Sequence, residues 1–289
     1  MSQLYIITDS SAHFPNPVYP GNNHVSILPI QIQIGNRIYL DSKDPKDQKK
    51  WFKNNEINKP KIVVPSVEDF SQIFYQCGQK HYSVLAILHS RQLSATVENA
   101  QKAARIVKNS SSINVIDSQT TGAGLGLLVQ AAAQAATQFN GNDVDAEAIC
   151  NHLRGLINHV YTVFFLPNLN SLAESGYLDP AQAIIGEMLG IIPFYVMESG
   201  RLVSVQKARN TRQLVDLLFE FVGEFTDLEH IAMLQGYPPY EQEIRSLRDR
   251  ISNAYPNVPL TEHHLSLSLL SLLGSHSLGL VVMEKMESL

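Results

Sequence analysis

Short apolar runs alternate with segments of helical periodicity through the first half of the chain, and this alternation constrains the fold more than any other feature. The sequence predicts strands at residues 4–10, 82–88 and 113–118 and helices at residues 66–79, 95–107 and 124–139. Strands and helices that alternate in this order form a largely parallel sheet with helices on its faces. The predicted fold class is therefore α/β.

Two local signals add detail to this half. Ile30, Ile32 and Ile34 alternate with polar residues, and the pair Gly35-Asn36 that follows favours a tight hairpin turn. Ser66, with Asp69 three residues later, is typical of a helix N-terminus with a capping box.

A polar, turn-rich segment at residues 140–148 separates the first half from a second half of different rhythm. We place the boundary in a predicted helix at residues 151–160 and expect two α/β domains, residues 1–155 and 156–289. The strands predicted in the second are TVFFL, IIPFYVM, RLVSVQKA, HIAMLQG and LGLVVME, with helices at Ala181–Leu189, Thr211–Phe225 and Pro239–Ala254.

The composition excludes several classes of partner and cofactor. The formal net charge is −5 and the basic residues are not clustered, so no nucleic-acid partner is predicted. Cys77 and Cys150 are far apart, and no histidine pair has an HExxH spacing, so we predict no metal site and no cofactor. The N-terminus does not read as a signal peptide, and no apolar stretch reaches the ~18 residues of a membrane span. We therefore predict a cytoplasmic location.

Small polar residues recur where the predicted parallel strands end. Open α/β sheets bind ligands at these strand ends, so the recurrence favours a polar floor for a small head group as much as a set of turns and caps, although each residue taken singly is more typical of a turn or a cap. Ser94 and Thr96 flank Ala95 at a predicted helix start, where hydroxyls either cap the helix or help to hold an anion. The strand-end clusters concerned are Thr8-Asp9-Ser10-Ser11, then Ser90 with Ser94 and Thr96, and Asp117-Ser118-Gln119-Thr120-Thr121.

An enzyme is the alternative interpretation of these residues. Asp9, Asp117 and His276 would serve one that acts on a small phosphorylated or carboxylated substrate, but the chain has no G-x-S-x-G nucleophile motif. The glycines of TTGAGLG lack the dinucleotide-binding spacing and instead predict close packing of a helix on the sheet. We expect His263-His264 to be a solvated pair.

The motifs, in this order, resemble those of the DegV family of bacterial fatty-acid-binding proteins. Each motif alone is weak, but the series covers nearly the whole chain. The matching segments are IITDSSAHFP, ILPIQIQIGNRIYLD, KIVVPSVEDF, SRQLSAT, VIDSQTTGAGLG, LNSLAESGYL, LGIIP, GRLVSVQKARN and GSHSLGLVV.

The resemblance implies a two-domain fold with one long-chain fatty acid, or a related lipid, in an apolar tunnel between the domains. Ser94 and the backbone N–H groups of Ala95 and Thr96 would hold the carboxylate, near a loop that contains His276. A protein of this kind catalyses nothing and presents its cargo to a fatty-acid kinase. Lys207 and Arg209 keep a basic element suited to a partner, and a peripheral membrane contact is a further candidate.

The chain also departs from the family pattern around the head group. Ile62 and Val63 stand where the family has Thr and Ser, and Ala95 replaces a Gly. Tyr177 and Ile192 replace an Arg and a Lys. Losing one hydrogen bond to a charged group costs about 1.5–3 kcal/mol. We therefore expect the tunnel to survive while carboxylate recognition is weakened or rebuilt. The competing hypothesis is a degenerate relative, with a filled or collapsed tunnel, that acts only through protein contacts.

Overall fold

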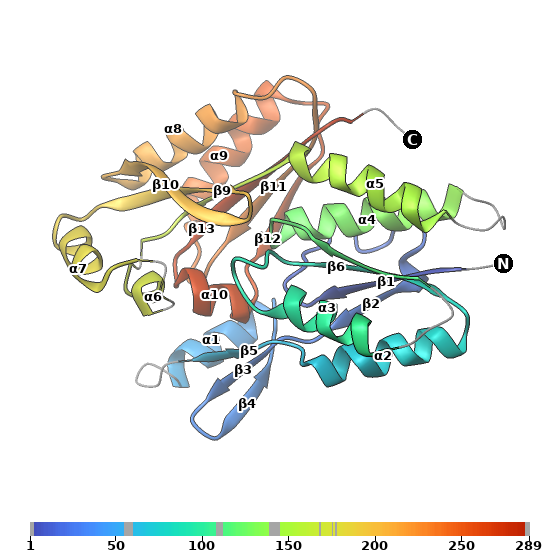
Figure 1. Cartoon of the computed structure of the whole chain (residues 1–289). Helices are drawn as coiled ribbons and strands as arrows, with labels where there is room; N and C mark the ends of the chain where they lie inside the picture. The colour runs from blue at the N-terminus through green and yellow to red at the C-terminus, as the bar shows by residue number, and fades with distance from the viewer. Residues whose placement is uncertain are drawn as a thin grey trace.

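The computed structural model describes residues 3–54, 60–107, 112–138, 145–167, 169–174, 176 and 178–286. Within these residues the chain forms three sheets, two large and one small, with helices between and around them (Figure 1). Tyr177, one of the departures from the family pattern, lies outside the described residues.

The first large sheet is wholly parallel, as the alternation of strands and helices predicts. Its strand order is β2-β1-β6-β7, and β6 is buried along its whole length. Successive residues of β6 face opposite layers: Leu85 and Ile87 join one core cluster, and Val84, Ala86 and Leu88 join another. The strands are β1 (Leu4–Asp9), β2 (Val25–Leu28), β6 (Ser83–Leu88) and β7 (Ile113–Asp117).

Helices cover both faces of this sheet. Figure 1 shows α2 (Val67–Gln79) and α3 (Thr96–Ile106) on one face, and α4 (Ala123–Gln138) and α5 (Ala146–Leu156) on the other. The predicted capping box is confirmed, because Ser66 Oγ accepts from the Asp69 N–H and the Asp69 carboxylate accepts from the Ser66 N–H.

The small sheet contains the predicted hairpin. Strands β3 (Gln31–Ile34) and β4 (Arg37–Leu40) pair antiparallel across Gly35-Asn36, and β5 (Lys61–Val63) pairs with the other edge of β3. Gly35 has a φ of +56°, which glycine adopts at low cost. Helix α1 (Pro45–Asn54) follows the hairpin and was not predicted, because its sequence is mostly polar.

The second large sheet is mixed, with the strand order β10-β9-β8-β13-β11-β12. The five predicted strands of this half are present, and α8 and α9 cover one face. The elements are η2 (Ile157–His159), β8 (Val160–Phe165), α6 (Leu169–Glu174), α7 (Pro180–Met188), β9 (Ile192–Glu198), β10 (Arg201–Ala208), α8 (Thr211–Val222), β11 (Leu228–Gln235), α9 (Glu241–Ala254), β12 (Leu260–His264), α10 (Leu267–Leu273) and β13 (Leu278–Glu284), with η1 (Asn22–His24) in the first half.

Strand β12 was not predicted, and it corrects one expectation. His263 and His264 are not a solvated pair, because both are half-buried on this strand. Burial, with smaller effects from His230, Lys43 and His264, lowers the pKa of His263 to about 4.

Helix α4 joins the two halves into one continuous core. It packs against β1 and β6 of the parallel sheet and against β8 and β13 of the mixed sheet. One hydrophobic cluster accordingly contains Leu85 and Leu125 from the first half and Phe164 and Leu269 from the second. The proposed division at residues 155/156 falls at the end of α5, between the last strand of one sheet and the first of the other.

The start of α4 packs against the chain that follows β1, as the glycine spacing predicts. A side chain at Gly126 would collide with the backbone carbonyl of His13, and one at Gly124 with Thr120. These glycines therefore serve close packing.

The surface includes an apolar face on α7. Ile184, Ile185, Met188 and the following Leu189 are each more than half exposed. No helix in the described ranges is both long enough and apolar enough to cross a membrane.

Candidate functional site

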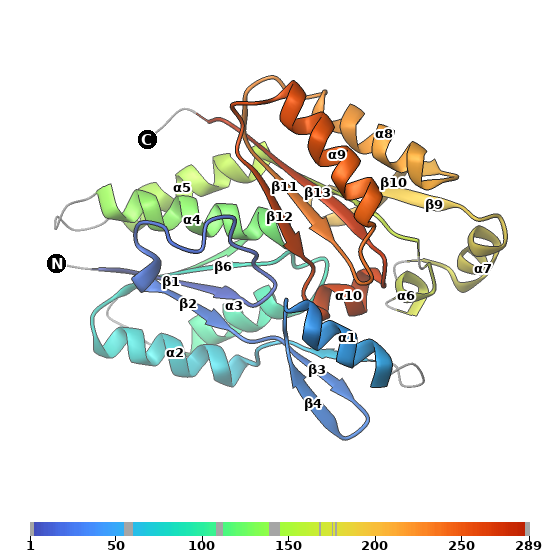
Figure 2. The same ribbon diagram turned by 180° about the vertical axis from the view of Figure 1, so that it is seen from behind.

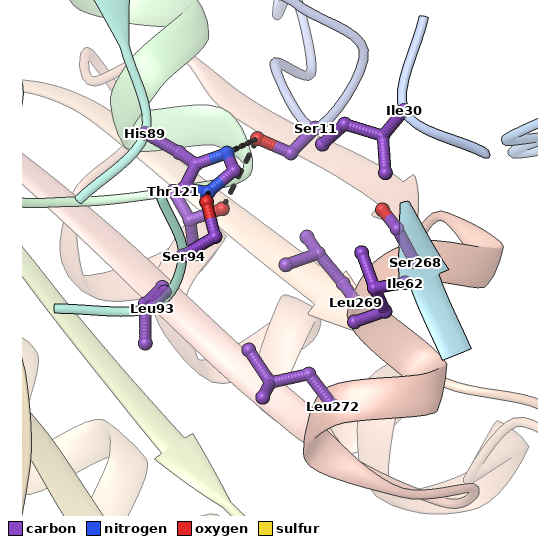
Figure 3. A pocket seen from close by; sticks show the side chains of 10 residues that line it. All are labelled: Ser11, Ile30, Ile62, His89, Leu93, Ser94, Thr121, Ser268, Leu269 and Leu272. Carbon is purple, nitrogen blue, oxygen red and sulfur yellow. Dashed lines mark hydrogen bonds between the residues drawn. The ribbon is translucent and has the colours of Figure 1, made fainter. Parts of the chain in front are cut away.

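A pocket opens at the C-terminal end of the parallel sheet, where loops of the first half meet α10 of the second (Figure 3). The polar side chains of His89, Ser11, Ser94 and Thr121 gather on one side of it. Apart from Ser268, apolar side chains surround the remainder, and the free volume is about 20 Å³, which is room for about one water molecule. The lining residues are Ser11, Ile30, Ile62, His89, Leu93, Ser94, Thr121, Ser268, Leu269 and Leu272.

Both halves contribute to the apolar wall. Figure 2 shows α10 lying over the small sheet and α1, and the backbone N–H of Leu267 donates to the Ser42 carbonyl at 2.9 Å. Leu269 and Leu272 of α10 thus line the pocket together with Ile62 of β5.

A buried ion pair organises the polar side. Asp9, at the end of β1, is fully buried, and His89, directly after β6, is 5% exposed. Asp9 Oδ1 lies 3.0 Å from His89 Nδ1, and Asp9 Oδ2 accepts from the His89 backbone N–H at 2.9 Å. Ser11 completes the shell, since its Oγ and its N–H both donate to Asp9 Oδ1, at 2.5 and 3.1 Å.

The pair shifts both pKa values towards the charged forms. Burial alone raises the pKa of Asp9, but the charge and hydrogen bonds of His89 outweigh it and leave a lowered value. Burial alone lowers the pKa of His89, but Asp9 outweighs it and leaves a raised value. Each partner therefore favours the charged form of the other.

His89 also contacts Ser94, the hydroxyl residue just before the start of α3. His89 Nε2 is hydrogen-bonded to Ser94 Oγ, which lies 2.8 Å from Thr96 Oγ1 and accepts from the Thr96 N–H at 3.2 Å. A chain of contacts thus runs from Asp9 through His89 to the hydroxyl of Ser94, which faces the pocket.

A second, half-buried carboxylate lies across the pocket on the small-sheet side. Asp41, just after β4, accepts from Ser10 Oγ at 2.9 Å and from the N–H and Oγ of Ser268 at 2.9 and 2.8 Å. Burial raises its pKa, although these hydrogen bonds and Lys43 oppose the shift. Asp41 therefore ties the first half to the start of α10.

The residues proposed from sequence are distributed unevenly around this pocket. Ser94 and Ile62 line it, while Asp9 and Thr96 stand behind the lining. Ala95 is exposed at the start of α3, and its φ of −79° suits a residue with a side chain, so the replacement of Gly is accommodated. Val63 is half-buried beside Ile62 on β5 and pairs with Gln31.

Four of the proposed residues make other contacts. Ser10 Oγ donates to Asp41, and Ser90 Oγ donates to the Gly200 carbonyl at 2.8 Å. Asp117 pairs with Arg91 at 3.1 Å. His276 packs against Tyr240, with ring centroids 5.7 Å apart. The alternative set of Asp9, Asp117 and His276 is not brought together at the pocket.

The proposed partner residues lie on the second half. Lys207 is exposed on the edge strand β10, and Arg209 is exposed just beyond its end. Ile192, the departure from a family Lys, begins β9 and is half-buried.

Sequence reasoning missed His89. Ser11 and Thr121 belong to the polar clusters predicted after the strands at residues 4–10 and 113–118, and both line the pocket. His89 directly follows the apolar run of β6, and only its pairing with Asp9 on the neighbouring strand makes it part of the site.

Comparison with protein families identifies the fold. A family model described as "Uncharacterised protein, DegV family" matches residues 3–285. The chain belongs to the DegV family. A DegV domain-containing protein of Streptococcus pneumoniae is 28% identical over 263 residues, 90% of this chain and 91% of that protein. One of Staphylococcus aureus is 24% identical over 78% of each chain.

Solved DegV structures superimpose on nearly the whole chain. A fatty acid binding DegV family protein of Streptococcus agalactiae has a TM-score of 0.85 at 22% identity, covering 99% of this chain and 100% of its own. DegV from Bacillus subtilis, described as a fatty acid binding protein, reaches 0.82 at 21%, with the same coverage. The Streptococcus pneumoniae fatty acid kinase B3 protein, loaded with linoleic acid, reaches 0.80 at 21%, covering 98% and 100%. The predicted DegV-like α/β fold is confirmed.

The ion pair generates a prediction for Asp9→Asn. Without the carboxylate, burial dominates at position 89, so the pKa of His89 should fall from above 6.5 to below it. Nitrogen-detected NMR titration of the imidazoles measures this directly. Asp249→Asn on α9 is the control and should leave the titration unchanged.

The same variant should be less stable, by about 3–5 kcal/mol where the pair is ionic. Asp9 contributes stability above its unfolded pKa of 3.8, and this contribution is lost as pH falls through its lowered folded value. His89 contributes fully below 6.5 and loses its contribution as pH rises through its raised folded value. Urea unfolding at a series of pH values should show the largest loss of unfolding free energy, relative to the wild type, between the folded-state pKa values of Asp9 and His89. The same loss at every pH would contradict the pairing.

Proposed function

We propose that this protein binds a long-chain fatty acid, or a related lipid, between its two halves and presents it to a partner protein. The observation that carries the proposal is the pocket itself, with an apolar wall from both halves and hydroxyls gathered on one side. An acyl chain with a polar head has this distribution of chemistry. Family membership adds support, since solved relatives are described as fatty acid binding and one is loaded with heptadecanoic acid.

The small free volume sets a condition on binding. About 20 Å³ holds a water molecule but not an acyl chain, so the wall has to move when a ligand enters. Leu269 and Leu272 lie on α10, a helix of seven residues, and are the side chains best placed to do so. Each ligand methylene that is buried in the pocket contributes about 0.8 kcal/mol to the free energy of binding. A long acyl chain therefore compensates for the free-energy cost of moving these leucines.

We infer that the partner is a fatty-acid kinase and that the protein itself is a carrier rather than an enzyme. A solved relative is described as the B3 protein of a fatty acid kinase, which supports this partner. The exposed Lys207 and Arg209 offer positive charge for docking. A cytoplasmic location and a peripheral membrane contact stay predictions.

Lipid content tests the binding proposal. We expect protein purified from a bacterial host to carry about one fatty acid per chain. The protein is denatured and extracted with organic solvent, and the released fatty acid is identified and quantified by mass spectrometry. Leu272→Trp fills the pocket and should release little, whereas Leu40→Trp, at an exposed position on β4, should release as much as the wild type. An empty wild-type extract, even after incubation with oleate and palmitate, would support the hypothesis of a degenerate relative.

Charge reversal tests the partner surface. Lys207→Glu with Arg209→Glu should raise the KM of a bacterial fatty-acid kinase for the loaded protein by about tenfold, since two attractive charges become repulsive. Acyl-phosphate formation from ATP is the readout. The control, Arg37→Glu with Lys46→Glu on the first half, changes the net charge equally. Equal effects of the two pairs would point to net charge rather than a docking site.

Hydrolysis of an acyl ester is a second candidate function, favoured by the order Asp9, His89, Ser94. Serine hydrolases align a carboxylate, an imidazole and a hydroxyl in the same way. Ser94 would attack the ester carbonyl, His89 would transfer its proton to the departing alcohol, and water would then release the acid. Against this, the Thr96 N–H donates to Ser94 Oγ itself and is not aimed at a substrate oxygen.

A fluorophosphonate probe separates the two candidates. Covalent labelling that is lost in both Ser94→Ala and His89→Ala would establish the hydrolase, and an unlabelled, folded protein would leave the carrier function.

A further inference from the structure

Most hydroxyl protons in the pocket already have acceptors within the protein. Among its described lining residues, four carry a hydroxyl: Ser11, Ser94, Thr121 and Ser268. Ser11 donates to Asp9, Ser268 donates to Asp41, and Thr121 donates more weakly to Ser11 at 3.4 Å. Ser94 is therefore the hydroxyl that decides whether a carboxylate ligand receives a hydrogen bond.

The protonation state of His89 sets the direction of the Ser94 proton. Asp9 accepts from Nδ1–H, so a neutral His89 presents a bare Nε2, and Ser94 donates its proton to that nitrogen. A protonated His89 donates from Nε2 to Ser94 Oγ instead. Only then is the Ser94 proton released from His89, and with Thr96 Oγ1 as donor to Ser94 Oγ at 2.8 Å it can point into the pocket.

Charge leads to the same conclusion. With His89 neutral, a ligand carboxylate would approach the buried charge of Asp9 without compensation, in surroundings of low dielectric constant. With His89 protonated, the Asp9–His89 pair is neutral overall. A carboxylate then meets both a hydrogen-bond donor and a nearby cation.

We propose that His89, in its imidazolium form, is the residue that gives this site its selectivity for a carboxylate, acting through Ser94. This rests on the proposed function, and it assigns to His89 the recognition that Ile62, which has no hydrogen-bond donor, does not provide. The ligand class is a carboxylic acid with an acyl tail, and it binds only when His89 carries a proton.

The charged groups around His89 favour that form. Asp9 contributes from β1, Asp117 from the end of β7 and Asp41 from the segment after β4, and all three oppose the effect of burial on the pKa of His89. Arg91 pairs with Asp117, and Lys43 lies near Asp41 and moderates their effect.

The proposal fixes the shape of the pH dependence. Affinity for dodecanoate, which stays monomeric in solution, should be constant between the pKa of its own carboxyl group and the pKa of His89 in the free protein, and fall about tenfold per pH unit above the latter. Affinity for dodecanol, which has the same tail without the charge, should not change over this range.

Calorimetry of dodecanoate binding tests the proton directly. One pH unit above the pKa of His89 determined by NMR, binding should take up about 0.9 proton per ligand, seen as a heat that depends on the ionisation enthalpy of the buffer. His89→Gln should abolish the buffer dependence and weaken binding about tenfold or more at low pH. His24→Gln, at a distant partly exposed histidine, should behave as the wild type.

Ser94→Ala is the second variant and keeps the ion pair intact. It should weaken dodecanoate binding while leaving the titration of His89 in place. If His89→Gln does not fold, the pH dependence of dodecanoate affinity and the proton uptake of the wild-type protein are sufficient to test the role of His89.

The outcomes separate this proposal from the one on which it rests. Dodecanoate binding that is equally tight above and below the pKa of His89, with no proton uptake, overturns the role of His89 and leaves fatty-acid binding standing. An absence of dodecanoate binding at every pH overturns fatty-acid binding itself.

Discussion

The contact between Asp9 and His89 is the interaction on which the site depends. It joins the ends of two neighbouring strands, and one carboxylate satisfies the imidazole, a backbone N–H and the hydroxyl of Ser11. A buried carboxylate is tolerated only when it is paired and fully hydrogen-bonded, so these partners are mutually required. The loop from β6 to α3, which carries Ser94, takes its position from this contact.

The apolar side of the site is formed by core packing rather than by hydrogen bonds. Its side chains belong to the same continuous core that joins the two halves, so the protein closes the pocket by packing against itself. Close packing and ligand capacity therefore compete for the same leucines. Two of them lie on α10, a short helix outside both large sheets whose start Asp41 holds through Ser268.

Patterns local in sequence predicted most of the fold. The alternation of strands and helices, the Gly35-Asn36 hairpin and the Ser66 cap each depend on a few adjacent residues, and each is present. Strand β12 escaped prediction because its Thr-Glu-His-His sequence lacks apolar alternation and depends on pairing with β11.

The site was harder to predict, because contacts between strands decide it. His89 and Asp9 are 80 residues apart in the sequence, and neither residue alone indicates an ion pair at the site. Ser90, equally plausible from sequence, turns away from the pocket to Gly200, and His276 packs against Tyr240. Periodicity locates strand ends but does not tell which side chain at each end faces the ligand.

The contact at Gly200 links two surfaces that would otherwise be separate. Ser90 Oγ donates to its carbonyl with no space for a side chain between them, and the neighbouring Arg201 donates to Gln92 at 3.1 Å. Both contacts tie the turn between β9 and β10 to the loop that carries Ser94. Lys207 belongs to the same hairpin. A partner that docks on Lys207 would therefore contact the same hairpin that holds the Ser94 loop in place.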